Sequence, residues 1–335
     1  MGYITSLMKN NIIDRFITER PLFLLVLLLV IFVIFSAIIP RFFSVYNIFN
    51  MSKYGVEIGL LALAETLVII SGGGGIDLSV GSMMTLTTVF LGHLTIRMGL
   101  NVWLASIGAV FGGALLGLFN GALINLTGIL PLIVTLSTMY AYNSLALVLS
   151  AGMPMPGVGD IRQFPESFFV LGQSDLFGGI PFQVLIFFLP LTLLLWFLLS
   201  KTVFGRYLYA VGSNARAAHF AAIRVTYIRL WVYVASGTLA GIAAVIKASR
   251  VASASPDAGL GTELQAITIA VLGGVNIMGG EGKIAGTFLS IAIITMIYNG
   301  LDLGGVHSIW QVGTLGFILI FSVLLNQFLI QRRGE

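Results

Sequence analysis

The chain has 335 residues, of which 58% are hydrophobic and only 9% are charged. An average soluble domain is about 25% charged, so most of this chain cannot face water, and we predict a polytopic membrane protein. The net charge of +4 is small and the basic residues lie mainly in predicted loops, which argues against a nucleic-acid surface. With no cysteine and three scattered histidines, the sequence offers no thiol chemistry and no cluster of metal ligands.

The apolar segments predict an all-α fold with about ten transmembrane helices, some of them broken. Residues 1–20 are expected to form a cytosolic N-terminal segment, and residues 21–331 a single transmembrane domain. If a short segment is re-entrant, the number of spans falls to eight or nine. The predicted spans are 21–40, 56–70, 83–98, 102–126, 131–150, 180–199, 227–246, 264–278, 286–301 and 309–331.

Three connecting segments set the predicted topology. Residues 41–54 and 151–179 are expected outside, the latter because its acidic residues outnumber its basic ones. The loop 201–229 is expected in the cytoplasm, because it carries five basic residues without any Asp or Glu. Both chain ends then lie in the cytoplasm. The basic residues of this loop are Lys201, Arg206, Arg216, Arg224 and Arg229.

A short helix is predicted inside the cytosolic loop. Asn214 can act as the N-cap of residues 215–220, because its side-chain oxygen can accept from the free N–H groups of the first turn. Gly212 permits a tight turn just before the cap.

Glycines at spacings of four along 108–121 predict a face on which two helices pack closely.

Two similar glycine-rich segments predict helix breaks. Residues 74–81 read GGIDLSVG and residues 273–280 read GGVNIMGG, and both follow an apolar run. Six predicted crossings separate them, so they share an orientation, as in transporters built from parallel repeats; chance resemblance in a chain with 40 glycines is the alternative. Broken helices at membrane depth are tolerated only when buried in protein or lining an aqueous cavity, so we expect the pathway near them.

Two carboxylates accompany the first break. Glu65 lies in the middle of a predicted span, where a carboxylate costs about 2.5–3.5 kcal/mol, so it is either a functional contact to solute or partner, or a protonated or internally bonded structural group. Asp77 is expected to cap the helix that begins near Ser79 rather than to contact a ligand.

The sequence resembles the permease subunits of bacterial ABC importers of the ribose type. The resemblance runs from about residue 60 to the end and rests on co-linear motifs. It differs from the usual pattern in the four glycines at 72–75, in a charged residue at Glu65, and in alanines at 221 and 222 where glycine is common. The motifs are GGIDLSVGS at 74–82, PLIVTLSTM at 131–139, GRYLYAVGSNARAAHFAAIRV at 205–225, the block from PDAGLGTELQ to GGEGKIAGT at 256–287, and YNGLDLGGV at 298–306.

The resemblance implies a transport subunit of the bacterial inner membrane that is not an enzyme. A separate ATPase would bind ATP and Mg²⁺ and grip the coupling segment, while this chain binds no cofactor. A second permease subunit, identical or different, would complete the pore, and an extracytoplasmic binding protein would deliver a monosaccharide or related polyol. The coupling residues implied are Gly212, Asn214, Ala215, Arg216, Ala217 and Ala218, and the pathway candidates are Glu65, Asp77, Ser79, Thr135 and Asn276.

Three alternatives stay open at this stage. The imported solute could be a nucleoside or a sugar-like signal molecule. The chain could be a secondary transporter in which Glu65 and Asp77 carry a coupling ion. It could also be a membrane scaffold without transport. No GxxxxGK[ST] pattern occurs, so energy from ATP would have to come from a partner.

Overall fold

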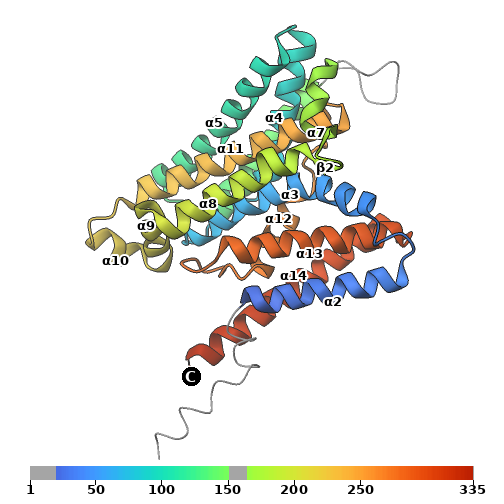
Figure 1. The fold of residues 1–335 in the computed structure, drawn as a ribbon. Helices are drawn as coiled ribbons and strands as arrows, with labels where there is room; N and C mark the ends of the chain where they lie inside the picture. Colours follow the sequence, from blue (N-terminus) through green and yellow to red (C-terminus); the bar gives the residue numbers. More distant parts are fainter. Residues whose placement is uncertain (1–19, 151–163, 335) are drawn as a thin grey trace, which may run out of the picture.

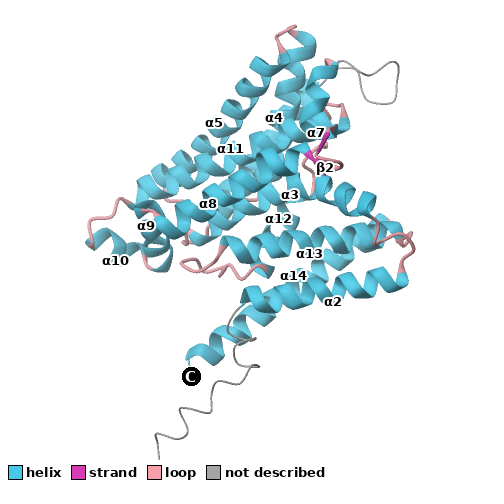
Figure 2. Cartoon of the chain, in the orientation of Figure 1, coloured by secondary structure: helices cyan, strands magenta, loops and turns pink. Residues whose placement is uncertain are grey.

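The structure is a computed structural model that describes residues 20–150 and 164–334; the predicted N-terminal segment lies almost wholly outside these residues. The described chain is almost entirely helical, with one small antiparallel hairpin (Figures 1 and 2). Its first half contains α2 (Arg20–Ile38), α3 (Val45–Ile70), α4 (Val80–Gly92), the π-helical turn η1 (His93–Arg97), α5 (Val102–Thr127) and α6 (Pro131–Ser150).

The second half begins with short elements and continues with long helices. Its elements are η2 (Glu166–Phe169), α7 (Val170–Gln173), β1 (Asp175–Leu176), β2 (Ile180–Pro181), η3 (Val184–Phe188), α8 (Leu189–Lys201), α9 (Val203–Ser213), α10 (Ala215–Phe220), α11 (Val225–Val251), α12 (Thr262–Leu272), α13 (Ile284–Leu303) and α14 (Ser308–Gly334).

Six helical segments among the described residues are long and apolar enough to cross a membrane: α2, α5, α6, η3 with α8, α11 and α13. The polytopic class is therefore confirmed. Each of the ten predicted spans contains a helix, but α12 has only 11 residues, and α3 carries Lys53, Glu57 and Glu65. The number of ten crossings stays a prediction.

Three boundaries predicted from the sequence are wrong. The segment 41–54 is not a loop throughout, because α3 begins at Val45, capped by Ser44, whose hydroxyl accepts from the N–H of Asn47 at 3.2 Å. The segment before Asn214 is also helical, since α9 fills Val203–Ser213. The span predicted at 264–278 ends at Leu272, because the chain turns at Gly274 with φ of 91°.

Two groups of connecting segments lie at opposite ends of the molecule. In Figure 1, α9 and α10 lie at one end, and the α2–α3 and α13–α14 connections lie at the other. The predicted glycine face of α5 is confirmed, because α5 packs on α11 backbone to backbone. A Cβ at Gly117 would lie 2.0 Å from the carbonyl oxygen of Tyr233, and one at Gly113 would lie 2.5 Å from that of Gly237.

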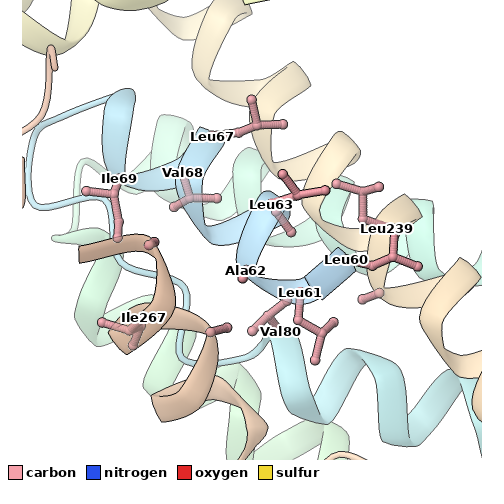
Figure 3. Close-up of a cluster of buried hydrophobic side chains, with 14 of the residues drawn as sticks. Leu60, Leu61, Ala62, Leu63, Leu67, Val68, Ile69, Val80, Leu239 and Ile267 are labelled. Atoms are coloured by element: carbon pink, nitrogen blue, oxygen red, sulfur yellow. The ribbon is translucent and has the colours of Figure 1, made fainter. Parts of the chain in front are cut away.

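The core is built around the second half of α3. Residues 59–70 are all buried, and Figure 3 shows apolar side chains of this segment between α4, α11 and α12. Val80, Leu239 and Ile267 from these three helices belong to the same cluster. A helix enclosed by protein can carry a carboxylate such as Glu65, because that group meets polar protein atoms instead of lipid.

Candidate functional site

A cavity of about 630 Å³ opens among α3, α11, α12 and α13, toward the end remote from α10. One face of α3 lines it, because its lining residues recur every three or four positions. One face of α13 lines it in the same way. The polar residues in its wall are Arg41 and Ser44 before α3, Tyr46, Asn47, Asn50, Tyr54 and Glu57 from α3, Lys247 and Arg250 from α11, Thr262 and Gln265 from α12, Thr295, Tyr298, Asn299 and Asp302 from α13, and Gln311 from α14.

Amide groups join the helices around this cavity. Asn47 on α3 and Asn299 on α13 form a reciprocal pair, in which each Nδ2 donates to the other's Oδ1, at 2.9 and 3.1 Å. Gln265 on α12 donates through Nε2 to the hydroxyl oxygen of Tyr298 on α13, at 3.4 Å. These hydrogen bonds hold α3, α12 and α13 in position around the cavity.

Two of the charged groups in the cavity wall, Glu57 and Arg250, form an ion pair. Arg250 donates through Nε and Nη2 to the two carboxylate oxygens of Glu57, at 2.7 and 2.9 Å, in a bidentate pair. Its guanidinium also lies 4.4 Å from the ring centre of Tyr54. Lys247 donates to the carbonyl oxygen of Ala258. Arg41 and Asp302 also line the cavity and make no ion pair within the described chain, so its wall carries unpaired charges of both signs.

A second polar cluster is fully buried around Asp77, in the break between α3 and α4. The carboxylate of Asp77 accepts from the N–H and hydroxyl of Ser79, at 3.0 and 2.5 Å, and from the hydroxyl of Ser236 on α11 at 3.0 Å. Glu65 on α3 accepts through Oε1 from the N–H of Asp77 at 3.1 Å. The Asp77 carboxylate bonds the N–H of Ser79, the residue just before α4, and no N–H group within that helix, so it orders the turn that leads into α4 and does not cap its first turn.

The cluster extends from Asp77 to α5 and α6. Asn120 on α5 donates to the hydroxyl of Ser79 at 2.7 Å and accepts from the hydroxyl of Tyr142 on α6 at 2.9 Å. The hydroxyl of Thr135 on α6 lies between the carbonyl oxygen of Ile76, at 3.1 Å, and the N–H of Leu78, at 3.2 Å. Side chains of α3, α5, α6 and α11 therefore hold the irregular segment in place.

The structure brings four of the five predicted pathway residues together and separates the fifth. Glu65, Asp77, Ser79 and Thr135 are 0% exposed within the chain and meet in the cluster around Asp77. Asn276 lies in the loop after α12, where its side-chain oxygen accepts from the N–H of Met278 at 3.0 Å. None of the five is among the residues that line the cavity.

The predicted capping helix is confirmed as α10. Asn214 accepts through Oδ1 from the N–H of Ala217 at 3.0 Å, and the helix covers Ala215–Phe220 as expected. Arg216 and Ala217 are exposed, and Phe220 at the end of the helix is 87% exposed. Ala218 is buried and faces the protein. The helix thus presents one free surface beyond the bundle (Figure 1).

Three backbone segments meet just before α10, at a contact that we call the glycine junction: Gly212, Gly72 and Gly279–Gly280. A Cβ at Gly212 would lie 1.9 Å from the carbonyl oxygen of Ile70 and 2.6 Å from the nitrogen of Gly280. The N–H of Gly280 donates to the Ile70 oxygen at 3.0 Å. The junction therefore connects the end of α9 to the end of α3 and to the loop after α12.

Comparison with known proteins identifies the chain. Residues 47–323 match the family described as the branched-chain amino acid transport system permease component. The chain belongs to this permease family. The permease is 37% identical over 309 residues to the autoinducer 2 import system permease LsrD of Klebsiella pneumoniae, with 92% of each chain covered. It is 37% identical over 300 residues to the ribose import permease RbsC of Bacillus subtilis, with 90% of each covered.

A third relative, the ribose import permease RbsC of Escherichia coli, is 34% identical over 310 residues, with 90% of this permease and 92% of the relative covered. No solved structure matches the permease. The predicted family is confirmed, and the permease is a multi-pass subunit of an ABC importer in the bacterial inner membrane, a transport component rather than an enzyme.

The residues of the cavity are not among those predicted from the sequence. The signal was present, because Asn47, Asn50, Tyr54 and Glu57 repeat at intervals of three or four residues, which places them on one face of a helix. These polar residues were assigned to an external loop and to the start of a span. A polar stripe on a transmembrane helix indicates a water-filled or polar interior instead.

Proposed function

We propose that the permease forms the translocation pathway of an ATP-driven importer for a monosaccharide or related polyol, which an extracytoplasmic binding protein delivers. The glycine junction is the observation that carries this proposal. It links α10, which is capped by Asn214 and exposes Arg216, Ala217 and Phe220, to α3 and α12, whose other ends line the cavity.

In this mechanism the ATPase partner grips α10 through its exposed surface, which includes Arg216 and Ala217. The ATPase binds ATP and Mg²⁺, and the permease binds no cofactor. Movement of α10 is transmitted through Gly212 to the ends of α3 and the α12 loop, because backbone atoms in contact cannot move independently. Shifts of α3 and α12 would open and close the cavity, which is alternating access.

The proposed membrane topology follows from the contact between α10 and the ATPase, because the ATPase lies in the cytoplasm. The end that carries α10 is cytosolic, the cavity opens toward the extracytoplasmic side, the helices make ten crossings, and both chain ends are cytosolic. A second permease subunit, identical or different, completes the pore. The transmembrane domain covers 21–331, with the coupling segment within 201–229.

The cluster around Asp77 has a structural role in this proposal. Glu65, Asp77, Ser79 and Thr135 hold the break between α3 and α4 beside the pathway, and Asn276 shapes the loop that reaches the glycine junction. A bond from Glu65 to a backbone N–H favours the structural interpretation of this carboxylate over direct solute contact. The autoinducer 2 relative supports a sugar-like signal molecule as the second candidate solute.

Coupling through α10 gives a testable prediction. The Arg216→Glu change is expected to abolish copurification of the ATPase, because it reverses a charge on the exposed side of the coupling helix without removing its cap. Asn214→Ala is expected to weaken copurification, since loss of an N-cap costs about 0.5–2 kcal/mol. Both are measured by affinity purification from native membranes with mass spectrometry of the bound chains.

Tyr140→Phe is the control, because Tyr140 is exposed on α6 and far in sequence from α10. Recovery of a P-loop ATPase with wild type and with the control, but not with Arg216→Glu, supports the proposal. Absence of any ATPase from wild-type preparations that retain other membrane complexes contradicts it and favours transport driven by an ion gradient. A second permease chain in the wild-type preparation would identify a heterodimer.

A further inference from the structure

We propose that Arg229 and the glycine turn after α3 form a binding site for a phosphate monoester group on the cytosolic side of the permease. The group belongs to a soluble phosphate compound or to a lipid headgroup such as phosphatidic acid, because both present the same terminal oxygens. Only the assignment to the cytosolic side rests on the proposed function. The basis is an unpaired cation, two free N–H groups beside it, and their position next to the glycine junction.

Arg229 is a half-buried cation without a counter-ion. It lies in the second turn of α11 and takes part in neither of the two ion pairs within the described chain. Its Nε atom is buried and has no hydrogen-bond partner among the described residues. A buried cation that loses water without gaining a partner costs free energy, so an anion bound here would be stabilising.

The guanidinium of Arg229 lies against the turn that follows α3. A Cβ at Gly73 would lie 2.4 Å from Nη2, 3.0 Å from Cζ and 3.4 Å from Nη1 of Arg229. A side chain at position 73 would therefore displace the guanidinium, whereas glycine lets the cation approach the backbone closely. The end of α3 and the start of α11 thus both contribute to the site.

Two exposed N–H groups of this turn have no acceptor. Gly72, Gly73 and Gly74 have φ of 68°, 67° and 73°, so three successive residues adopt the left-handed conformation. The N–H of Gly72 donates to the carbonyl oxygen of Ile69 at 3.0 Å. The N–H groups of Gly73 and Gly74 make no hydrogen bond within the described chain, and both residues are exposed. Successive free N–H groups in a turn attract anions.

A second donor without a partner lies one turn further along α11. The side chain of Tyr233 is 1% exposed, and its hydroxyl has no hydrogen-bond partner among the described residues. Tyr233 and Arg229 are four residues apart, which places them on the same face of α11. Buried polar atoms without a partner mark a place where a ligand or water completes the bonding.

These donors suit a phosphate better than a carboxylate. A guanidinium presents its donors in a planar fork that pairs with two oxygens of a phosphate. A phosphate monoester has three terminal oxygens, so one remains for the backbone N–H groups, whereas a carboxylate has only two. The segment 201–229 contains no Asp or Glu that would repel the anion.

The site adjoins the glycine junction. A Cβ at Gly72 would lie 2.4 Å from the carbonyl oxygen of Gly212, so Gly72 is part of the junction and Gly73 is the next residue. A phosphate at Gly73 therefore touches the chain one residue from the contact that joins α3 to α9. Binding of the phosphate and movement of α9 are expected to affect each other.

The test measures hydrogen–deuterium exchange of the whole importer complex in phosphatidylcholine nanodiscs. Mass spectrometry follows peptides that contain Gly73 and Gly74, so phosphate bound at the ATPase does not contribute. Inorganic phosphate is the probe, with chloride at equal ionic strength and acetate as comparators. We expect phosphate, and neither comparator, to slow the exchange of these two N–H groups.

Arg229→Gln should raise the Kd for phosphate about 10-fold or more, the loss expected for hydrogen bonds to a charged group. Arg229→Lys keeps the charge but not the fork and should lose less. Arg97→Gln is the matched control, because it removes an exposed charge on η1, at the far end of α4 from the glycine turn, and should leave the Kd unchanged.

A second set of nanodiscs contains phosphatidic acid and no added phosphate. Protection in this set alone identifies the lipid headgroup as the source, and protection by inorganic phosphate alone identifies a soluble compound. Either result supports the proposal when Arg229→Gln weakens the protection.

The proposal is overturned by no protection in either set, by equal protection with acetate, or by unchanged protection in Arg229→Gln. Thermal melting shows whether each variant is folded, and the wild-type comparison needs no variant. An importer that retains its ATPase but shows no protection refutes this inference alone. Protection in a purified permease that recovers no ATPase refutes the proposed function alone.

Discussion

The Gly212→Ala variant is expected to lose solute uptake. The added Cβ would lie 1.9 Å from the carbonyl oxygen of Ile70 and 2.6 Å from the nitrogen of Gly280, and both are backbone atoms that cannot rotate away. Inserting a methyl group into packed atoms costs about 1–3 kcal/mol, occasionally more, and this site belongs at the upper end. We expect a lower melting temperature and a separation of α9 from the ends of α3 and the α12 loop.

The measurement is ATP-dependent uptake in proteoliposomes that contain the whole importer, together with ATPase copurification. The matched control is Gly313→Ala on α14, because no atom lies within 4 Å of a Cβ at that position. Uptake lost while the ATPase is retained would place the defect in transmission through the glycine junction. Uptake at the wild-type rate in Gly212→Ala would show that the junction does not transmit the movement of α10.

The sequence predicts best what local chemistry decides. The bounds of α10 and its Asn214 cap agree with the prediction, because the capping oxygen and the first turn are three residues apart in the chain. The span 131–150 agrees with α6, because Pro131 begins a long apolar run. Ala222 has φ of 60°, so the position where the family commonly has glycine adopts the conformation that glycine favours.

Contacts between distant backbone segments could not be predicted. The glycine junction joins residues 70, 212 and 280, and no side-chain pattern records a contact that backbone atoms make. The start of α3 was missed for a related reason. Its polar residues face a cavity whose other walls come from α11, α12 and α13, so their environment depends on helices some 200 residues later in the chain.

The chain contains a second internal similarity, which was not predicted. Residues 77–82 read DLSVGS and residues 257–262 read DAGLGT, and they lead into α4 and α12. The two segments touch, because a Cβ at Gly81 would lie 2.5 Å from the carbonyl oxygen of Gly259. The similarity between 74–81 and 273–280 stays a prediction; the Gly280 N–H bonds the carbonyl oxygen of Ile70, at the end of α3.

Glu65→Gln is expected to keep ATP-driven uptake close to that of wild type, whereas Glu65→Leu is expected to lose it. The glutamine side-chain oxygen can still accept from the N–H of Asp77, as Oε1 does at 3.1 Å. Leucine leaves that N–H buried and unpaired, which costs about 1–3 kcal/mol and loosens the break between α3 and α4. Melting temperature and uptake in proteoliposomes check both variants.

The same pair of variants decides between ATP-driven and ion-coupled transport. An amide cannot take up and release a proton, so a permease in which Glu65 carries a coupling proton loses transport in Glu65→Gln while remaining folded. A permease in which Glu65 only holds the backbone of Asp77 keeps transport in that variant and loses it in Glu65→Leu. Asp77→Ala should resemble Glu65→Leu but be more severe, because the Ser79 N–H and hydroxyl and the Ser236 hydroxyl then lose their common acceptor.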